Sequence, residues 1–92
     1  MLIARVIGTV VATRKHELLI GSKIQVVQPL DSRGQTAKGD PFVAVDAVGA
    51  GVGERVMVVL GSSARLALDK DFCPVDATII GIVDQIEIER DL

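Results

Sequence analysis

Aromatic residues are nearly absent from this 92-residue sequence, which has two phenylalanines, Phe42 and Phe72, and neither tyrosine nor tryptophan. Small barrels that bind single-stranded nucleic acid usually stack the bases on aromatic side chains. A basic excess is missing as well, because 12 acidic residues against 10 basic ones give a net charge of −2. Nucleic-acid-binding domains normally carry a basic patch. Both shortages count against that class, and nucleic acid is not expected as a partner.

Cysteine and histidine each occur once, as Cys73 and His16. A single cysteine excludes a disulfide within the chain and is typical of a reducing cytoplasm. Two such ligands are too few for a structural zinc site. The sequence therefore predicts no metal site and no cofactor. Cys73, which precedes Pro74, is expected to be a small buried hydrophobe.

Long apolar runs are also missing, since no run approaches the roughly 20 residues of a transmembrane helix. Residues 1–5 lack the pattern of a signal peptide, so no membrane partner is expected. Nevertheless, 49% of the residues are hydrophobic and the mean hydropathy is +0.45. A single domain at residues 1–92 is small, and domains of this size bury only about 60% of their unfolded surface. The apolar surplus indicates burial between subunits, a usual supplement to a small core.

Period-two alternation of apolar residues, interrupted by turn residues, predicts an all-β fold. Strands are expected at residues 2–12, 18–28, 42–48, 55–60 and 78–90, with a surface loop at 29–41. In the second strand, Lys23 and Gln25 are assigned to one face, and the other face carries Leu18, Ile20, Ile24 and Val26. Five strands and one short helix indicate a closed or partly closed antiparallel barrel.

Residues 49–54, Gly-Ala-Gly-Val-Gly-Glu, directly follow a predicted strand. A dinucleotide-binding fingerprint requires Gly-x-Gly-x-x-Gly, but Glu54 occupies the place of the third glycine. Glycine permits positive φ angles and close approach of two backbones. The segment therefore predicts a tight turn built for close packing, including packing against a second copy of the chain.

The segment Gly61-Ser62-Ser63-Ala64-Arg65 is similar to a nucleophile elbow, Gly-x-Ser-x-Gly, but Arg65 replaces the closing glycine. The only histidine lies in a charged turn at residues 14–17, so a base for Ser62 or Ser63 is missing. Either serine is instead expected to cap a short helix at residues 64–68. No catalytic residues are predicted, and the chain is not expected to be an enzyme.

Two aspartates, Asp46 and Asp84, interrupt otherwise apolar strands. A buried carboxylate needs hydrogen bonds or a charged partner. One interpretation is a structural aspartate satisfied near the end of a strand. The other is a contact between subunits, with Arg65 or Arg55 as the partner. The sequence leaves both open.

Five blocks of the sequence resemble the EutN/CcmL family, the vertex proteins of bacterial microcompartment shells. They are residues 7–15 (IGTVVATRK), 27–31 (VQPLD), 44–54 (AVDAVGAGVGE), 61–65 (GSSAR) and 74–84 (PVDATIIGIVD). The blocks follow one another in order over nearly the whole chain. The sequence departs from the family pattern only at residues 31–41 and 66–73. These departures bear on the subtype within the family and not on membership of the family.

The resemblance implies a five-stranded β-barrel related to the OB fold, with one short helix, that assembles as a ring. It implies a homopentamer that caps the five-fold vertices of a polyhedral shell in the cytoplasm, where sheets of hexameric shell proteins close. A ring uses a heterologous interface, in which two different patches of each chain meet. The alternative function is an OB-type nucleic-acid-binding module.

The resemblance and the residue patterns together give a predicted subunit interface. Its members are Asp46, Gly49, Ala50, Gly51, Gly53, Glu54, Ser62, Ser63, Arg65 and Asp84. Glu54 and Arg65 are expected to fix the angle and register between neighbours, because paired charges give specificity more than affinity.

Overall fold

The computed structural model describes residues 1–13, 15, 17–19, 21–68 and 75–89. The expectations for His16 and for Cys73 before Pro74 fall outside the described residues. The elements in chain order are strand β1 (Leu2–Val10), a 3₁₀ helix (Glu17–Leu19), strands β2 (Lys23–Pro29), β3 (Phe42–Asp46) and β4 (Arg55–Leu60), helix α1 (Ser62–Ala67) and strand β5 (Ala77–Ile82).

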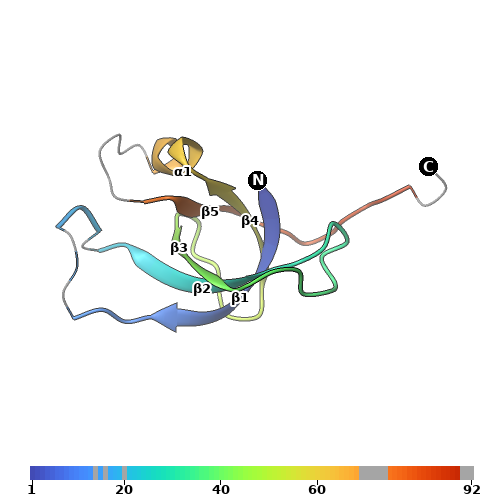
Figure 1. Ribbon diagram of the computed structural model, residues 1–92, viewed down its shortest axis with the longest axis horizontal. Coiled ribbons are helices and arrows are strands. Elements are labelled where there is room, and N and C mark those ends of the chain that lie inside the picture. Colours follow the sequence, from blue (N-terminus) through green and yellow to red (C-terminus); the bar gives the residue numbers. More distant parts are fainter. Residues whose placement is uncertain (14, 16, 20, 69–74, 90–92) are drawn as a thin grey trace.

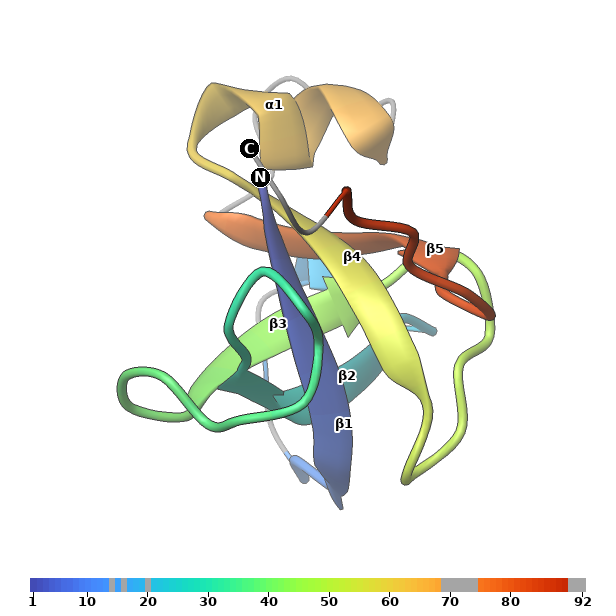
Figure 2. The same ribbon diagram turned by 90° about the vertical axis from the view of Figure 1, so that its right-hand side faces the viewer.

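The five strands form a closed barrel in the order β1-β2-β3-β5-β4, and α1 lies outside it (Figures 1 and 2). The predicted five-stranded barrel with one short helix is thus confirmed. Its strands are not all antiparallel, because β3 and β5 run parallel, with Val45 opposite Thr78 and Asp46 opposite Ile79. An odd number of strands in a closed ring cannot alternate in direction throughout, so at least one neighbouring pair must be parallel.

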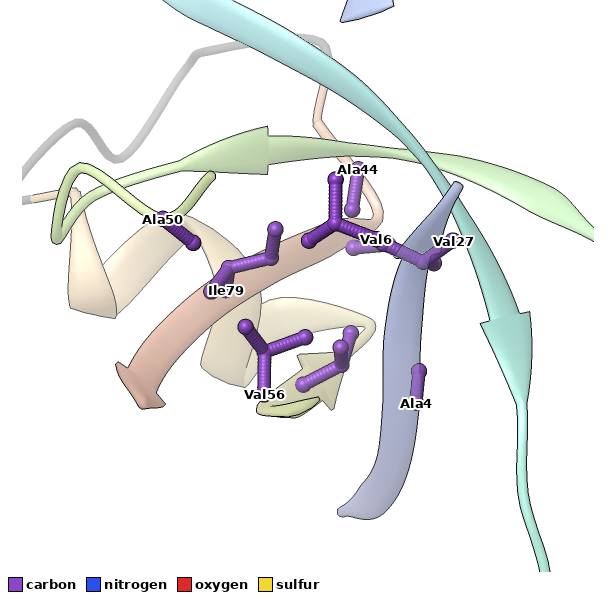
Figure 3. Close-up of a cluster of buried hydrophobic side chains, with 9 residues drawn as sticks. Ala4, Val6, Val27, Ala44, Ala50, Val56 and Ile79 are labelled. Atoms are coloured by element: carbon purple, nitrogen blue, oxygen red, sulfur yellow. The ribbon is translucent and has the colours of Figure 1, made fainter. Parts of the chain in front are cut away.

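The barrel interior is filled by small apolar side chains, chiefly alanine and valine, as Figure 3 shows. The cluster consists of Ala4, Val6, Val27, Ala44, Ala50, Val56, Val58, Ala77 and Ile79. A second cluster, in which Ala64 of α1 packs with Val45 and Val59, fastens the helix to the barrel. Burying one such valine or isoleucine stabilises the fold by about 1.5–3 kcal/mol.

The second strand begins later than predicted. The chain forms a 3₁₀ helix at Glu17–Leu19, and β2 begins at Lys23. Gln25 is fully buried, whereas Ile24 is only half-buried. The residues divide between the two faces as assigned, and the face of Gln25 is the one that turns to the interior, where hydrogen bonds satisfy its amide.

Helix α1 begins two residues earlier than expected, at Ser62. Its N-cap is Gly61, with φ 63° and ψ −139°, and no side chain donates or accepts a capping hydrogen bond. The predicted capping by Ser62 or Ser63 was wrong, because both serines lie within the helix and are exposed to solvent.

Strand β5 ends at Ile82, eight residues before the predicted end. The described residues that follow, 83–89, leave the barrel and run outward beside the 31–41 loop (Figure 1). Strands β1 and β3 are each two residues shorter than predicted. Alternation of side chains alone does not make a strand, because the backbone also needs a pairing partner.

Candidate functional site

The glycine turn, residues 47–54, is held by the carboxylate of Asp46. Its Oδ1 accepts hydrogen bonds from the backbone N–H groups of Val48 and Gly49, both at 2.9 Å. Its Oδ2 accepts one from the N–H of Ala50 at 2.7 Å. A single side chain at the end of β3 thus fixes the first half of the turn.

Gln25 supports the same turn from inside the barrel. Its Nε2 donates to the carbonyl of Ala50 at 2.7 Å and to Oδ2 of Asp46 at 3.2 Å. Its Oε1 accepts a hydrogen bond from Oγ1 of Thr9 at 2.8 Å. Lys23 Nζ donates to the same Ala50 carbonyl at 2.8 Å. Gln25 was not among the residues predicted for the site; the signal available in the sequence was an amide side chain within a β-branched strand.

Partial burial of Asp46 disfavours its charge. The hydrogen bonds from Val48, Gly49, Gln25 and Ala50 outweigh this burial, so the pKa of the carboxyl lies below its ordinary value of 3.8. Hydrogen bonds to the charged form lower a carboxyl pKa in this way. Asp46 therefore remains ionised and keeps all its acceptor capacity at neutral pH.

Glu54 closes the second half of the turn. Its Oε1 accepts a hydrogen bond from the N–H of Gly51 at 2.7 Å, and its own N–H donates to the Gly51 carbonyl at 3.1 Å. Gly53 has a φ of 94° and Gly49 a φ of 81°, a region that other residues rarely adopt. The turn is also tied to β1, since Arg5 Nη1 donates to the Gly53 carbonyl at 2.7 Å.

This tightly bonded turn presents two apolar side chains outward. Val48 is 40% exposed and Val52 is 64% exposed. The hydrogen bonds from the turn to Asp46 and Glu54 reduce the conformational entropy that the turn would lose on binding. The turn is therefore a preorganised apolar projection.

The remaining predicted interface residues lie elsewhere. Ser62, Ser63 and Arg65 belong to α1, and Arg65 Nη1 donates to the carbonyl of Val75 at 3.4 Å. Asp84 follows β5, is exposed, and its carbonyl accepts a hydrogen bond from Arg55 Nη2 at 3.4 Å. Within one chain, the predicted residues thus form three separate groups: the turn, the helix and the segment after β5.

The two interpretations of Asp46 can now be compared. The structure shows the first, because the carboxylate is satisfied near the end of its strand by groups of its own chain. Both arginines named in the second interpretation donate to backbone carbonyls of their own chain. Contacts of Asp46, Asp84, Glu54 and Arg65 with a neighbouring copy stay predictions.

An apolar groove lies at the starts of β3 and β5. It has a volume of about 430 Å³ and is lined by Phe42, Val43, Leu60, Asp76 and Ala77. Val43 is 50% exposed and Leu60 is 45% exposed. Figure 2 shows the start of β3 and the glycine turn on opposite sides of the barrel. Each subunit thus presents two different apolar patches that face in different directions.

Among the described residues, no three histidine, cysteine, aspartate or glutamate side chains gather in a way that would hold a metal ion. The same residues contain no helix long and apolar enough to cross a membrane.

The family model described as ethanolamine utilisation protein EutN/carboxysome matches residues 1–84. The chain belongs to the EutN/CcmL family. Among curated relatives, the microcompartment shell vertex protein GrpN of Rhodospirillum rubrum is 48% identical over 87 residues, which are 95% of this chain and 97% of GrpN. The carboxysome shell vertex protein CcmL of Synechococcus elongatus is 48% identical over 90 residues, which are 98% of this chain and 90% of CcmL.

Solved structures agree with the sequence matches. The pentameric microcompartment shell protein GrpN from Rhodospirillum rubrum superposes with a TM-score of 0.87 at 45% identity, covering 97% of this chain and 100% of that one. The CcmL structure from Gloeobacter violaceus gives a TM-score of 0.88 at 39% identity, covering 97% and 91%. The family resemblance and the barrel fold inferred from the sequence are confirmed.

Proposed function

We propose that this protein is a structural component of a bacterial microcompartment shell, where it forms pentamers that cap the five-fold vertices. The shell lies in the bacterial cytoplasm, and hexameric shell proteins form the flat facets that the pentamers close. Support comes from relatives at 48% identity that are shell vertex proteins. A solved relative at 45% identity over nearly the whole chain is pentameric.

The observation that carries the proposal is the pair of unlike apolar patches on one small barrel. A closed ring of identical chains needs a heterologous interface, in which one patch of each copy meets a different patch of the next. The glycine turn supplies a rigid projection with Val48 and Val52 on one face of the barrel, and the groove beside Val43 belongs to the face across the barrel, so the two faces of each copy differ. A barrel with a single patch would form a dimer at most.

The ten predicted interface residues have different roles in this ring. Asp46, Gly49, Ala50, Gly51, Gly53 and Glu54 shape and hold the turn. Asp46 acts as a positioning residue, because its carboxylate orients the backbone of the turn through hydrogen bonds. Ser62, Ser63 and Arg65 on α1 and Asp84 after β5 are exposed or half-exposed polar groups. They form the polar rim of the contact between neighbours, where charges set register.

The proposed role includes no catalysis, metal ion, cofactor or membrane partner. The OB-type nucleic-acid-binding alternative is not favoured. A gel shift with single-stranded DNA at low salt separates the two functions, because non-specific binding is strongest there. The vertex role predicts that the DNA band does not move, and a retarded band would favour the alternative.

Co-expression with a hexamer-forming shell protein tests the vertex role. We expect closed polyhedral particles by electron microscopy when this chain is present, and open sheets or tubes when it is omitted. The control is a variant that folds but does not form rings, which should behave like the omission. Closed particles of equal number without the chain would contradict the proposal.

A further inference from the structure

The segment after β5, residues 83–89, is held to the rest of the chain through its root, residues 83–86. The N–H of Val83 donates to the carbonyl of Arg55 at 2.9 Å. Arg55 Nη2 donates to the carbonyl of Asp84 at 3.4 Å. Ile86 packs over Gly34, where an added Cβ would lie 2.7 Å from the Ile86 Cδ1. The root therefore lies fixed beside the 31–41 loop, and the rest projects away from the barrel (Figure 1).

From residue 85 onward, the segment has the sequence pattern of a half-buried strand. Gln85, Glu87 and Glu89 alternate with Ile86 and Ile88, which places the polar and apolar side chains on opposite faces of an extended backbone. No strand of the described residues pairs with this segment, and Ile88 is 41% exposed. A strand pattern without a strand partner indicates that the partner belongs to another chain.

The groove contains a sheet edge suited to such a segment. Within the described part of the chain, β5 pairs with β3 only at Val45 and Asp46. No strand of the described residues therefore pairs with the edge of residues 42–44 that faces away from β2. Val43 and Leu60, each about half-exposed, line the groove beside this edge. An extended peptide can add to a free strand edge through its backbone while its side chains enter apolar pockets.

We propose that residues 87–89 of each copy lie along this edge of β3 in the next copy, with Ile88 in the groove. The inference rests on the ring of the proposed function and assigns one of its contacts. The partner is a second copy of this chain, because the segment and the groove lie at different places on each copy. A heterologous ring requires two such different contact surfaces on every chain. The segment leaves its own barrel at the far end of β5 from the groove (Figures 1 and 2), so it does not fill its own groove.

Site-directed cross-linking tests this contact. Ile88→Cys and Val43→Cys are combined in a Cys73→Ser background, which removes the only native cysteine, and a short bis-maleimide is added to the assembled protein. We expect a ladder of covalent oligomers up to five chains on a denaturing gel, because each cross-link then joins two neighbours. The single variants should give no ladder. The matched control pairs Ile88→Cys with Val52→Cys on the glycine turn and should also remain monomeric.

A second measurement does not depend on cross-linking geometry. Ile88→Asp should raise the ring dissociation constant by about tenfold or more in native mass spectrometry, since it removes the burial of an isoleucine. Glu89→Gln, on the opposite face of the segment, should leave the ring unchanged. Circular dichroism of both variants should match the parent protein, because Ile88 lies outside the barrel core.

The outcomes separate this inference from the proposed function. An intact ring that gives no ladder with Ile88→Cys and Val43→Cys overturns the tail contact and leaves the vertex role standing. A ladder with Val52→Cys in place of Val43→Cys also overturns it, because the tail then contacts the glycine turn. A parent protein that forms no ring at micromolar concentration overturns both proposals together.

Discussion

Gln25 and Asp46 meet at the glycine turn, where Gln25 Nε2 lies 3.2 Å from Asp46 Oδ2 and 2.7 Å from the carbonyl of Ala50. Asp46 Oδ2 in turn accepts a hydrogen bond from the N–H of Ala50 at 2.7 Å. Both backbone groups of Ala50 are therefore bound by side chains of the barrel, and its methyl group enters the core. The relationship makes the shape of the turn depend on two polar residues.

Replacement of Asp46 should destabilise the protein. Asp46→Ala removes a charged acceptor of several hydrogen bonds and leaves partly buried donors unpaired, so we expect a loss of about 2–4 kcal/mol in the free energy of unfolding. Urea denaturation at fixed protein concentration measures the change. Asp40→Ala, in the exposed loop, is the control and should change stability by less than about 0.5 kcal/mol. Equal effects of the two variants would show that the turn does not depend on Asp46.

Acid should weaken the fold through the same carboxylate. The pKa of Asp46 is lower in the folded chain than its ordinary value of 3.8. A carboxyl group whose pKa is lower in the folded state than in the unfolded state stabilises the fold at pH values above its unfolded-state pKa. This stabilisation is lost as the pH falls from the unfolded-state pKa toward the folded-state pKa. The backbone N–H of Gln35 is the main cause of a similarly lowered pKa at Asp31.

Urea midpoints at neutral pH and at several values below about pH 5 measure this dependence. The midpoint of the parent protein should fall steadily over the acid range. Asp46→Asn should lose less stability over that range, because the titrating group is absent, and Asp31 should account for part of the remaining slope. Identical slopes for parent and variant would contradict the linkage.

A side chain at Gly53 should strain the turn. The φ of Gly53 is 94°, and an added Cβ there would meet open space, so any cost of Gly53→Ala comes from the backbone alone. We expect a loss of about 1–2 kcal/mol in thermal or urea unfolding. Gly8→Ala is the matched control, since its Cβ would lie 3.9 Å from the Val26 Cβ, an ordinary contact. A neutral Gly53→Ala would show that the turn relaxes at no cost.

Gly51→Val tests the close packing inferred for the turn. Gly51 does not have a positive φ, but its Cβ would lie 3.3 Å from Glu54 Oε1, so a branched side chain displaces the carboxylate that closes the turn. We expect dissociation or aggregation of the ring, seen by size-exclusion chromatography. Intact rings of Gly51→Val would refute the assignment of this turn to the interface.

Much of the architecture was accessible from the sequence because strand positions depend on local patterns. Alternation and β-branched runs located β1, β3 and β4 to within about two residues. The glycine and aspartate content of residues 46–54 indicated the turn. The family resemblance supplied the ring, which the properties of one chain only suggested through its apolar surplus.

The failures of prediction have physical causes beyond local pattern. The burial of Gln25 depends on Thr9 and Asp46, which are distant in sequence. The parallel pairing of β3 with β5 follows from closing a ring of five strands. The pattern of residues 83–89 predicted a strand, but no strand in the described part of the chain pairs with it. Local sequence propensity does not predict pairing between residues that are distant in the sequence.

Native mass spectrometry of the purified protein at low micromolar concentration tests the central claim most directly. A closed ring of five chains predicts a species of about 48 kDa, five times the 9.7 kDa of the chain, with no larger open series. A monomer of 9.7 kDa as the only species would contradict the ring, leave the apolar patches at Val43 and Val52 without a partner, and remove the basis for the vertex function.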